Sequence, residues 1–153
     1  MPFFDISQRL RCAALAALGG GALAQTISLW GGDMPIFLLP TTLMCIGGAT
    51  GAALAGFIMA DAFGRKGPRG VFWSVQAWWI TTVLGAWFGA AFFAIEANRN
   101  LFFVILCALD KAAWPGILTV MEGIAYSPAV AVIWLICGLA MHHGAMAERS
   151  PTT

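Results

Sequence analysis

Four long apolar blocks dominate the pattern of hydrophobic and polar positions along this chain. Each block is 19 to 25 residues long, and the first three contain no charged residue. The blocks are Cys12–Trp30, Ile36–Ala60, Val71–Ile95 and Ile117–Met141. A helix rises about 1.5 Å per residue and the hydrocarbon core of a bilayer is about 30 Å thick, so about 20 apolar residues span it. The pattern therefore predicts an all-α integral membrane protein with four transmembrane helices.

The stretch between the third and fourth blocks follows a different pattern. Leu101–Leu109 is apolar throughout, but its nine residues form a helix less than half a bilayer long. The charged pair Asp110-Lys111 follows, and Trp114–Gly116 then favours a break. A fifth span over 101–121 would place both charges in the membrane at a cost of roughly 2.5–3.5 kcal/mol each. We therefore predict an interfacial or partly inserted helix over about 101–114.

Composition excludes a separate water-soluble part. Hydrophobic residues make up 60% of the 153 residues and charged residues 10%, whereas an ordinary soluble domain has about 25% charged residues. Four spans and their connections use nearly the whole chain. Residues 1–153 are therefore expected to form a single membrane-embedded domain.

The placement of the basic residues predicts how the chain is threaded. Six of the eight fall before the first block, between the second and third, or after the fourth; they are Arg9, Arg11, Arg65, Lys66, Arg69 and Arg149. Arg99 and Lys111 would lie on the opposite side. Because cytoplasmic loops of membrane proteins are enriched in Lys and Arg, we predict a multi-pass protein of a bacterial-type inner membrane with both termini and the 61–70 loop in the cytoplasm.

The first block has an alternative interpretation. Arg9 and Arg11, an apolar run and Ala22-Leu23-Ala24 together resemble a secretory signal with an A-x-A cleavage site. The apolar character continues beyond that site to Trp30, which gives a block of spanning length. We favour an uncleaved first helix.

Small residues recur at four-residue spacing in the second and third blocks. In the second block, Gly47 and Gly51 form a G-x-x-x-G pair, and Ala52 and Gly56 have the same spacing. In the third block, Gly85 and Gly89 form a second G-x-x-x-G pair. Small residues on one helix face permit close packing of a neighbouring helix in membranes. These glycines are therefore predicted to be helix-packing positions, with a partner helix in this chain or in another.

The loop 61–70 is the most distinctive polar stretch. Its glycines and Pro68 favour a turn. Arg65, Lys66 and Arg69 are expected to act as a cytoplasmic anchor, because juxtamembrane cations are attracted to anionic lipids. Contact with lipid headgroups or with an acidic surface of a partner is the more specific alternative.

Two acidic residues are candidates for an ion or proton pathway. Glu122 lies inside the fourth predicted span, and intramembrane carboxylates usually face a bundle interior or a wet cavity. Pro128 cannot donate to the carbonyl of Ile124, which could help to line such a cavity. Asp110 is the second candidate. A structural ion pair of Glu122 with Lys111 or Arg99 is the competing interpretation.

The sequence contains few residues that indicate cofactor binding or catalysis. His142 and His143 are candidate cofactor ligands, for example to haem, but adjacent residues of a helix diverge, whereas metal sites prefer spacings of three or four. The four cysteines are dispersed, so no metal centre or disulfide is expected. No cofactor is evident, although the 7 Trp and 11 Phe residues suit contacts with pigment or quinone as well as lipid. No catalytic residues are evident.

These features favour an accessory or scaffolding subunit of a larger inner-membrane complex, such as a respiratory or photosynthetic assembly, rather than an enzyme. Membrane lipid and other membrane-protein subunits, or further copies of the chain, are the expected partners, and nucleic acid is not. The alternative is a small homo-oligomeric transporter or channel that uses Glu122. An enzyme of lipid or isoprenoid metabolism is a third and weaker option.

Overall fold

The computed structural model describes residues 6–30, 42–97 and 113–149, and these residues form helices and turns without any strand. The α-helices of this part of the chain are α1 (Ile6–Trp30), α2 (Thr42–Ile58), α3 (Pro68–Ala97), α5 (Ala113–Tyr126) and α6 (Pro128–Arg149), and a short 3-10 helix η2 (Ala60–Ala62) follows α2. The predicted all-helical class is therefore confirmed. Two segments, Ile6–Ile27 in α1 and Pro128–Ala147 in α6, are long and apolar enough to cross a membrane.

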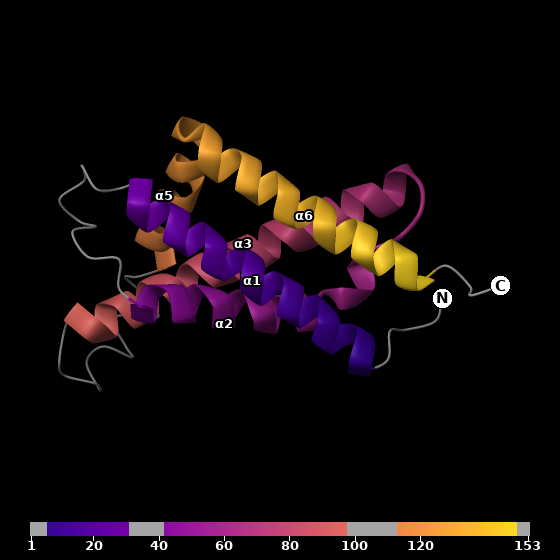
Figure 1. The fold of residues 1–153 in the computed structure, drawn as a ribbon, viewed down its shortest axis with the longest axis horizontal. Helices are drawn as coiled ribbons and strands as arrows, with labels where there is room; N and C mark the ends of the chain where they lie inside the picture. The colour runs from indigo at the N-terminus through magenta and orange to yellow at the C-terminus, as the bar shows by residue number, and fades with distance from the viewer. Residues whose placement is uncertain (1–5, 31–41, 98–112, 150–153) are drawn as a thin grey trace.

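The helices form a bundle in which the start of α1 and the end of α6 lie at the same end. The start of α1, the connection between α2 and α3, and the end of α6 are all at one end of the bundle (Figure 1). Side-chain contacts agree, because Arg9 of α1 and Arg149 of α6 both reach the segment Asp61–Phe63. We call this the loop end of the bundle.

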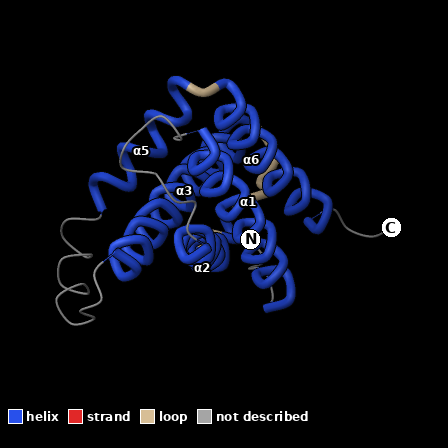
Figure 2. The backbone as a smooth tube through the Cα atoms, turned by 60° about the vertical axis from the view of Figure 1, so that its left-hand side comes forward, coloured by secondary structure: helices blue, strands red, loops and turns tan. Residues whose placement is uncertain are grey.

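Helix α2 is the centre of the packing, between α1 and α3 (Figure 2). Apart from Met44, its buried positions are small residues on two faces, one against α1 and the other against α3. Its exposed positions recur every fourth residue; they are Ile46, Thr50, Leu54 and Ile58. Residues four apart lie on the same face of a helix, so α2 presents one outward stripe and is otherwise enclosed by its neighbours.

The fourth apolar block is not a single helix as predicted from the sequence. Instead of one span over 117–141, α5 ends at Tyr126 and α6 begins at Pro128, and the two helices meet at a sharp bend (Figure 2). Proline has no N–H and disfavours helical backbone in the preceding residue. Backbone bonds persist on both sides of the bend, from Ser127 N to Gly123 O at 2.9 Å and from Ala131 N to Ser127 O at 3.0 Å.

The interior of the bundle contains many small side chains, and many of the large apolar side chains point outward. Ala16, Ala55, Ala60 and Ala77 are completely buried, while Phe63 is the largest side chain without exposed surface. In the 18-residue apolar stretch of each segment, only 28% of the residues of α1 and 22% of those of α6 are buried. A core helix of a soluble protein buries most of its surface, so these two segments differ from that class.

Several predicted features lie outside the described residues. They are the 31–35 turn, residues 101–112 of the predicted interfacial segment, Arg99, Asp110 and Lys111. The predictions made for them stay predictions.

Candidate functional site: the polar cluster at the loop end

The α2–α3 connection folds into a tight turn that places Phe63 in the core. Hydrogen bonds from Ala62 N to Met59 O (2.9 Å) and from Phe63 N to Ala60 O (3.2 Å) form the η2 turn. Gly64 then adopts φ +69° and Gly67 φ +82°, a left-handed conformation that costs other residues roughly 1–2 kcal/mol. This turn leaves backbone carbonyls of 57–63 available to side chains from α1 and α6.

Arg9 joins α1 to this turn. Its guanidinium forms an ion pair with the carboxylate of Asp61, and both side chains are 22% exposed. A second nitrogen of the same guanidinium donates to Phe57 O at 3.4 Å, and the group lies 5.9 Å from the centre of the Phe57 ring. A partly buried pair with additional contacts holds its geometry better than an exposed pair does. Arg9 therefore fixes the start of α1 against the end of α2.

Arg149 joins α6 to the same turn. Its Nε donates to Phe63 O at 3.1 Å and its Nη2 donates to Asp61 O at 2.9 Å. Arg65 also donates to Asp61 O, at 2.9 Å. Burial lowers the pKa of Arg149, the nearby Arg65 cation lowers it further, and Asp61 opposes the change. We call Arg9, Asp61, Arg65 and Arg149 the loop cluster.

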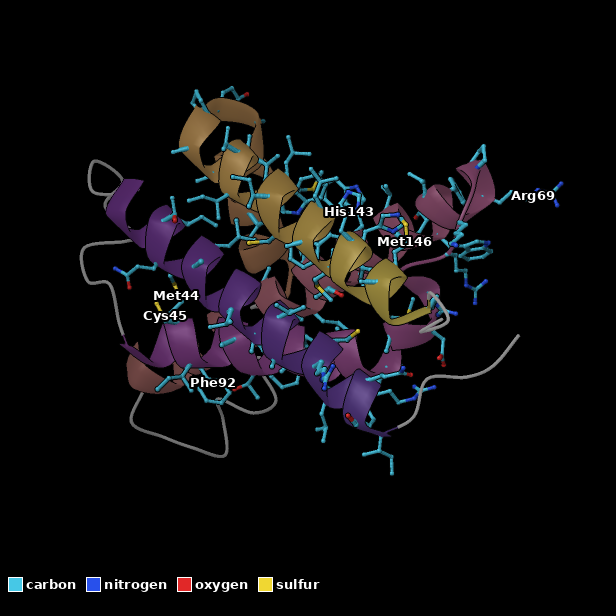
Figure 3. All side chains as sticks on the ribbon, turned by 45° about the vertical axis from the view of Figure 1, so that its right-hand side comes forward. Met44, Cys45, Arg69, Phe92, His143 and Met146 are labelled. Atoms are coloured by element: carbon cyan, nitrogen blue, oxygen red, sulfur yellow. The ribbon has the colours of Figure 1, made fainter. Side chains whose placement is uncertain are left out.

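The three cations predicted as a cytoplasmic anchor divide into two groups. Arg65 turns inward to the carbonyl of Asp61 and is only partly exposed. Lys66 and Arg69 are exposed, and Arg69 extends away from the bundle (Figure 3). Among the described residues, neither Lys66 nor Arg69 takes part in an ion pair. Arg65 is thus part of the internal cluster, and only the other two are available for outside contacts.

A buried serine–histidine pair lies next to the loop cluster. His142 Nδ1 is 2.8 Å from Ser74 Oγ, and Ser74 Oγ donates to Ala62 O at 3.1 Å. Because that donor bond uses the serine proton, the serine oxygen accepts from His142 Nδ1–H. Both side chains are buried and Ser74 lies within α3. The pair therefore connects α3, α6 and the α2–α3 turn, in a position that offers a substrate no access to the serine oxygen.

The two candidate cofactor ligands have different environments. His142 is buried and His143 is exposed, and their ring centres are 5.6 Å apart. In the described ranges, no group of three or more His, Cys, Asp or Glu side chains lies close enough to hold a metal ion, so neither histidine belongs to one. If a haem or pigment is bound, His143 or the Nε2 atom of His142 would be its ligand, but not both for one metal ion.

Two tryptophans connect α3 and α6 nearer the middle of the bundle. Trp78 Nε1 donates to Trp134 O at 3.1 Å, and Trp134 Nε1 donates to Thr82 Oγ1 at 2.9 Å. Trp79 also contacts Trp134, with ring centres 5.2 Å apart. Buried indole N–H groups need such partners. These bonds satisfy both indoles and hold the two helices together.

Glu122 has a different environment from the residues of the loop cluster. It lies on α5 with an exposed side chain, outside the two segments that could cross a membrane. Its neighbours Leu118, Met121 and Tyr126 are also exposed, Tyr126 to 75%. Glu122 takes no part in the ion pair between Arg9 and Asp61. The residues proposed to pair with it, Arg99 and Lys111, lie outside the described part.

The predicted packing glycines are buried at interfaces within this chain. A Cβ atom on Gly51 would lie 2.5 Å from Leu84 O, and one on Gly47 would lie 2.7 Å from Phe88 O, both on α3. On the α1 side, a Cβ on Gly56 would lie 2.5 Å from the Cβ of Ala16. Gly85 and Gly89 complete the α2–α3 interface, with distances of 3.2 Å to Gly48 O and 3.3 Å to Met44 O. These faces are therefore occupied by helices of the same chain.

Three members of the loop cluster and the buried serine are not predicted as site residues from the sequence. Arg9 and Arg149 were assigned only to topology, and Asp61 and Ser74 were not singled out. One signal was available: an acidic residue at the end of an apolar block needs a cation when it is partly buried. Nothing in the sequence indicates the Ser74–His142 contact, because the two residues are 68 positions apart.

A double-mutant cycle tests the Arg9–Asp61 pair. We expect Asp61→Asn and Arg9→Gln each to lower the free energy of unfolding by about 1–3 kcal/mol, because each leaves a partly buried charge without its partner. The double variant should lose less than the sum of the two. Thermal or denaturant unfolding in a mild detergent measures all four proteins. Strictly additive losses would show that the two side chains do not interact.

Comparisons with protein-family models, with curated proteins and with solved structures found no match.

Proposed function

We propose that this chain is an integral inner-membrane protein in which α1, α2, α3 and α6 cross the bilayer, and that it serves as an accessory or scaffolding subunit of a larger membrane complex. In this arrangement the loop end of the bundle is cytoplasmic. The two segments of spanning length, in α1 and α6, support the membrane location. Helix α3 supports it further, since it has 30 residues and none is charged between Arg69 and Glu96.

The distribution of charge supports the proposed orientation. Arg9, Arg65 and Arg149 meet at the loop end, and Lys66 and Arg69 are exposed at the same end. Collecting cations at one end of a bundle agrees with the enrichment of Lys and Arg on the cytoplasmic side of membrane proteins.

The scaffolding role rests on one observation: several polar side chains of the interior pair with one another across helices, while the outside carries apolar stripes. Arg9 with Asp61, Ser74 with His142, and Trp134 with Thr82 each connect two helices. On the outside, α6 presents an exposed apolar stripe at helical spacing, consisting of Val132, Leu135, Ile136 and Leu139. Exposed apolar surface of this kind marks contact with a membrane or a protein. Since the glycine faces are used internally, contacts with other subunits would use such outer stripes.

Co-purification tests this role. The tagged full-length chain would be extracted from its native membrane in a mild detergent, isolated, and examined by mass spectrometry. We expect other membrane proteins in fixed stoichiometry, and we expect Leu135→Trp or Leu139→Trp to release them without unfolding the chain. A matched control is Leu54→Trp, on the outward stripe of α2. A homogeneous oligomer of the chain alone would contradict the scaffolding proposal.

A transporter or channel formed by several copies is the second candidate, and the exposure of Glu122 favours it. A carboxylate on an apolar helix face is costly in lipid and usually faces protein or water. Two or more copies could enclose Glu122 between them. In that case Glu122→Gln abolishes ion-dependent flux in reconstituted vesicles and leaves the oligomer intact. An unchanged flux, or none in the original protein, would exclude this candidate.

A further inference from the structure

The first turns of α3 and the turn before them combine exposed cations with exposed aromatic rings. Lys66 and Arg69 are exposed, and Phe72 and Trp73 are 57% and 50% exposed. In Figure 3, Arg69 points away from every other helix. The two rings pack edge to face, with centres 6.0 Å apart and planes at 74°.

Helical spacing places these side chains on a single outward face. Arg69, Phe72, Trp73 and Gln76 follow the spacing of three, four and seven residues that defines one side of a helix. All four are exposed, whereas Gly70, Ser74, Ala77 and Trp78 are buried on the opposite side. Lys66 lies in the turn just before α3. We call Arg69, Phe72 and Trp73, together with Lys66, the α3 face.

We propose that the α3 face is a binding site for the headgroup of an anionic phospholipid. The inference rests on the proposed membrane location, and it adds a lipid class and the residues that select it. Lys66 and Arg69 would contact the phosphate and the anionic headgroup. Phe72 and Trp73 would lie one turn deeper, about 4.5–6 Å along the helix, where aromatic rings are favoured at the boundary between headgroups and acyl chains.

The arrangement of the neighbouring cations explains why only two of them select the lipid. Arg65 donates to Asp61 O and Arg149 donates to Phe63 O, so both guanidinium groups are engaged in the loop cluster. Lys66 and Arg69 remain exposed beside an apolar surface. Charge complementarity therefore favours an anionic partner, and the adjoining rings favour one that also carries acyl chains.

Lipid titration followed by native mass spectrometry tests the proposal. The full-length chain in a mild detergent would be titrated with phosphatidylglycerol or with phosphatidylcholine of the same acyl chains. Each cation contributes about fivefold to binding near an anionic surface, so we expect phosphatidylglycerol to bind roughly 25-fold more tightly. Lys66→Gln and Arg69→Gln should each weaken its binding about fivefold, with phosphatidylcholine binding unchanged. Arg11→Gln, which removes an exposed cation of α1, should change it less than about twofold.

Three outcomes would overturn the site: equal binding of the two lipids, an unchanged preference in both variants, or displacement of phosphatidylglycerol by soluble glycerol phosphate. Release of a co-purifying subunit by Arg69→Gln, with lipid binding unchanged, would indicate an acidic protein surface instead. Extraction of native membranes with alkaline carbonate tests the proposed membrane location separately from the lipid-binding site. A chain that is released by carbonate contradicts the membrane location, and a chain that stays embedded without lipid preference contradicts only the site.

Discussion

Gly64→Ala is expected to lower the free energy of unfolding by about 3–5 kcal/mol, which combines the cost of a left-handed alanine with the cost of overpacking. Gly64 has φ +69°, and a Cβ atom there would overlap the backbone of Ala145 and Met146 in α6. Neither backbone can move independently, because Arg149 connects the same part of α6 to Phe63 O and Asp61 O. The α2–α3 turn and α6 would have to separate.

Gly67→Ala provides a matched control for that change. Gly67 is also left-handed, with φ +82°, but a Cβ atom there would have no neighbour within 4 Å. We expect Gly67→Ala to cost only the conformational part, about 1–2 kcal/mol. Unfolding followed by circular dichroism in a mild detergent measures both variants. Equal losses for the two would show that α6 does not approach Gly64 closely.

Gly51→Ala is expected to have the second large effect, a loss of about 2–3 kcal/mol. The added Cβ atom would lie 2.5 Å from Leu84 O and 2.7 Å from the Cβ of Phe88, so α2 and α3 would have to move apart. Gly51→Leu should prevent the bundle from forming. Loss of the monodisperse peak in size-exclusion chromatography and a lower melting temperature report both effects.

Gly21→Ala, on the α1 side of α2, is the control because it has room for the added methyl group. A Cβ atom on Gly21 would be 3.7 Å from its nearest neighbour, the Cβ of Ala49, which is ordinary contact. Alanine also favours helix by about 1 kcal/mol over glycine in water. We therefore expect Gly21→Ala to be neutral or slightly stabilising. A Cβ atom on Gly89 would lie 3.3 Å from Met44 O. The loss of stability for Gly89→Ala should therefore lie between those for Gly21→Ala and Gly51→Ala. The same loss in all three variants would contradict close packing at Gly51.

Gly64→Ala and Gly51→Ala affect different parts of the bundle, the first its loop end and the second its centre. A loss of contact at Gly64 affects the junction of α2, α3 and α6, whereas a change at Gly51 affects the α2–α3 interface. Because the affected contacts are distinct, the losses in a Gly64→Ala and Gly51→Ala double variant should be close to additive if both retain the folded bundle. Protease sensitivity of the α2–α3 turn should increase more for Gly64→Ala.

The helical class and the approximate course of α1, α2 and α3 follow from the pattern of apolar residues alone. Long apolar blocks without charge must form helices if they lie in a membrane, because lipid offers no partners to the backbone N–H and C=O groups. The block Val71–Ile95 lies entirely within α3, Pro68–Ala97. The break at Pro128 also has a cause in the sequence, because proline lacks the N–H that would continue α5 into α6. Only the structure shows the consequence of this break, which is two helices in place of the predicted span over 117–141.

Which residues contact each other depends on how the helices pack. Helical periodicity fixes the residues that share a face, but it does not fix the neighbour of that face or the register between the two helices. Gly51 was predicted as a packing position, yet only the bundle shows that its neighbour is α3 of the same chain. The convergence of Arg9 and Arg149 on the Asp61 turn depends on three helix ends lying together. Contacts between residues so far apart in sequence are set by packing, which local patterns do not encode.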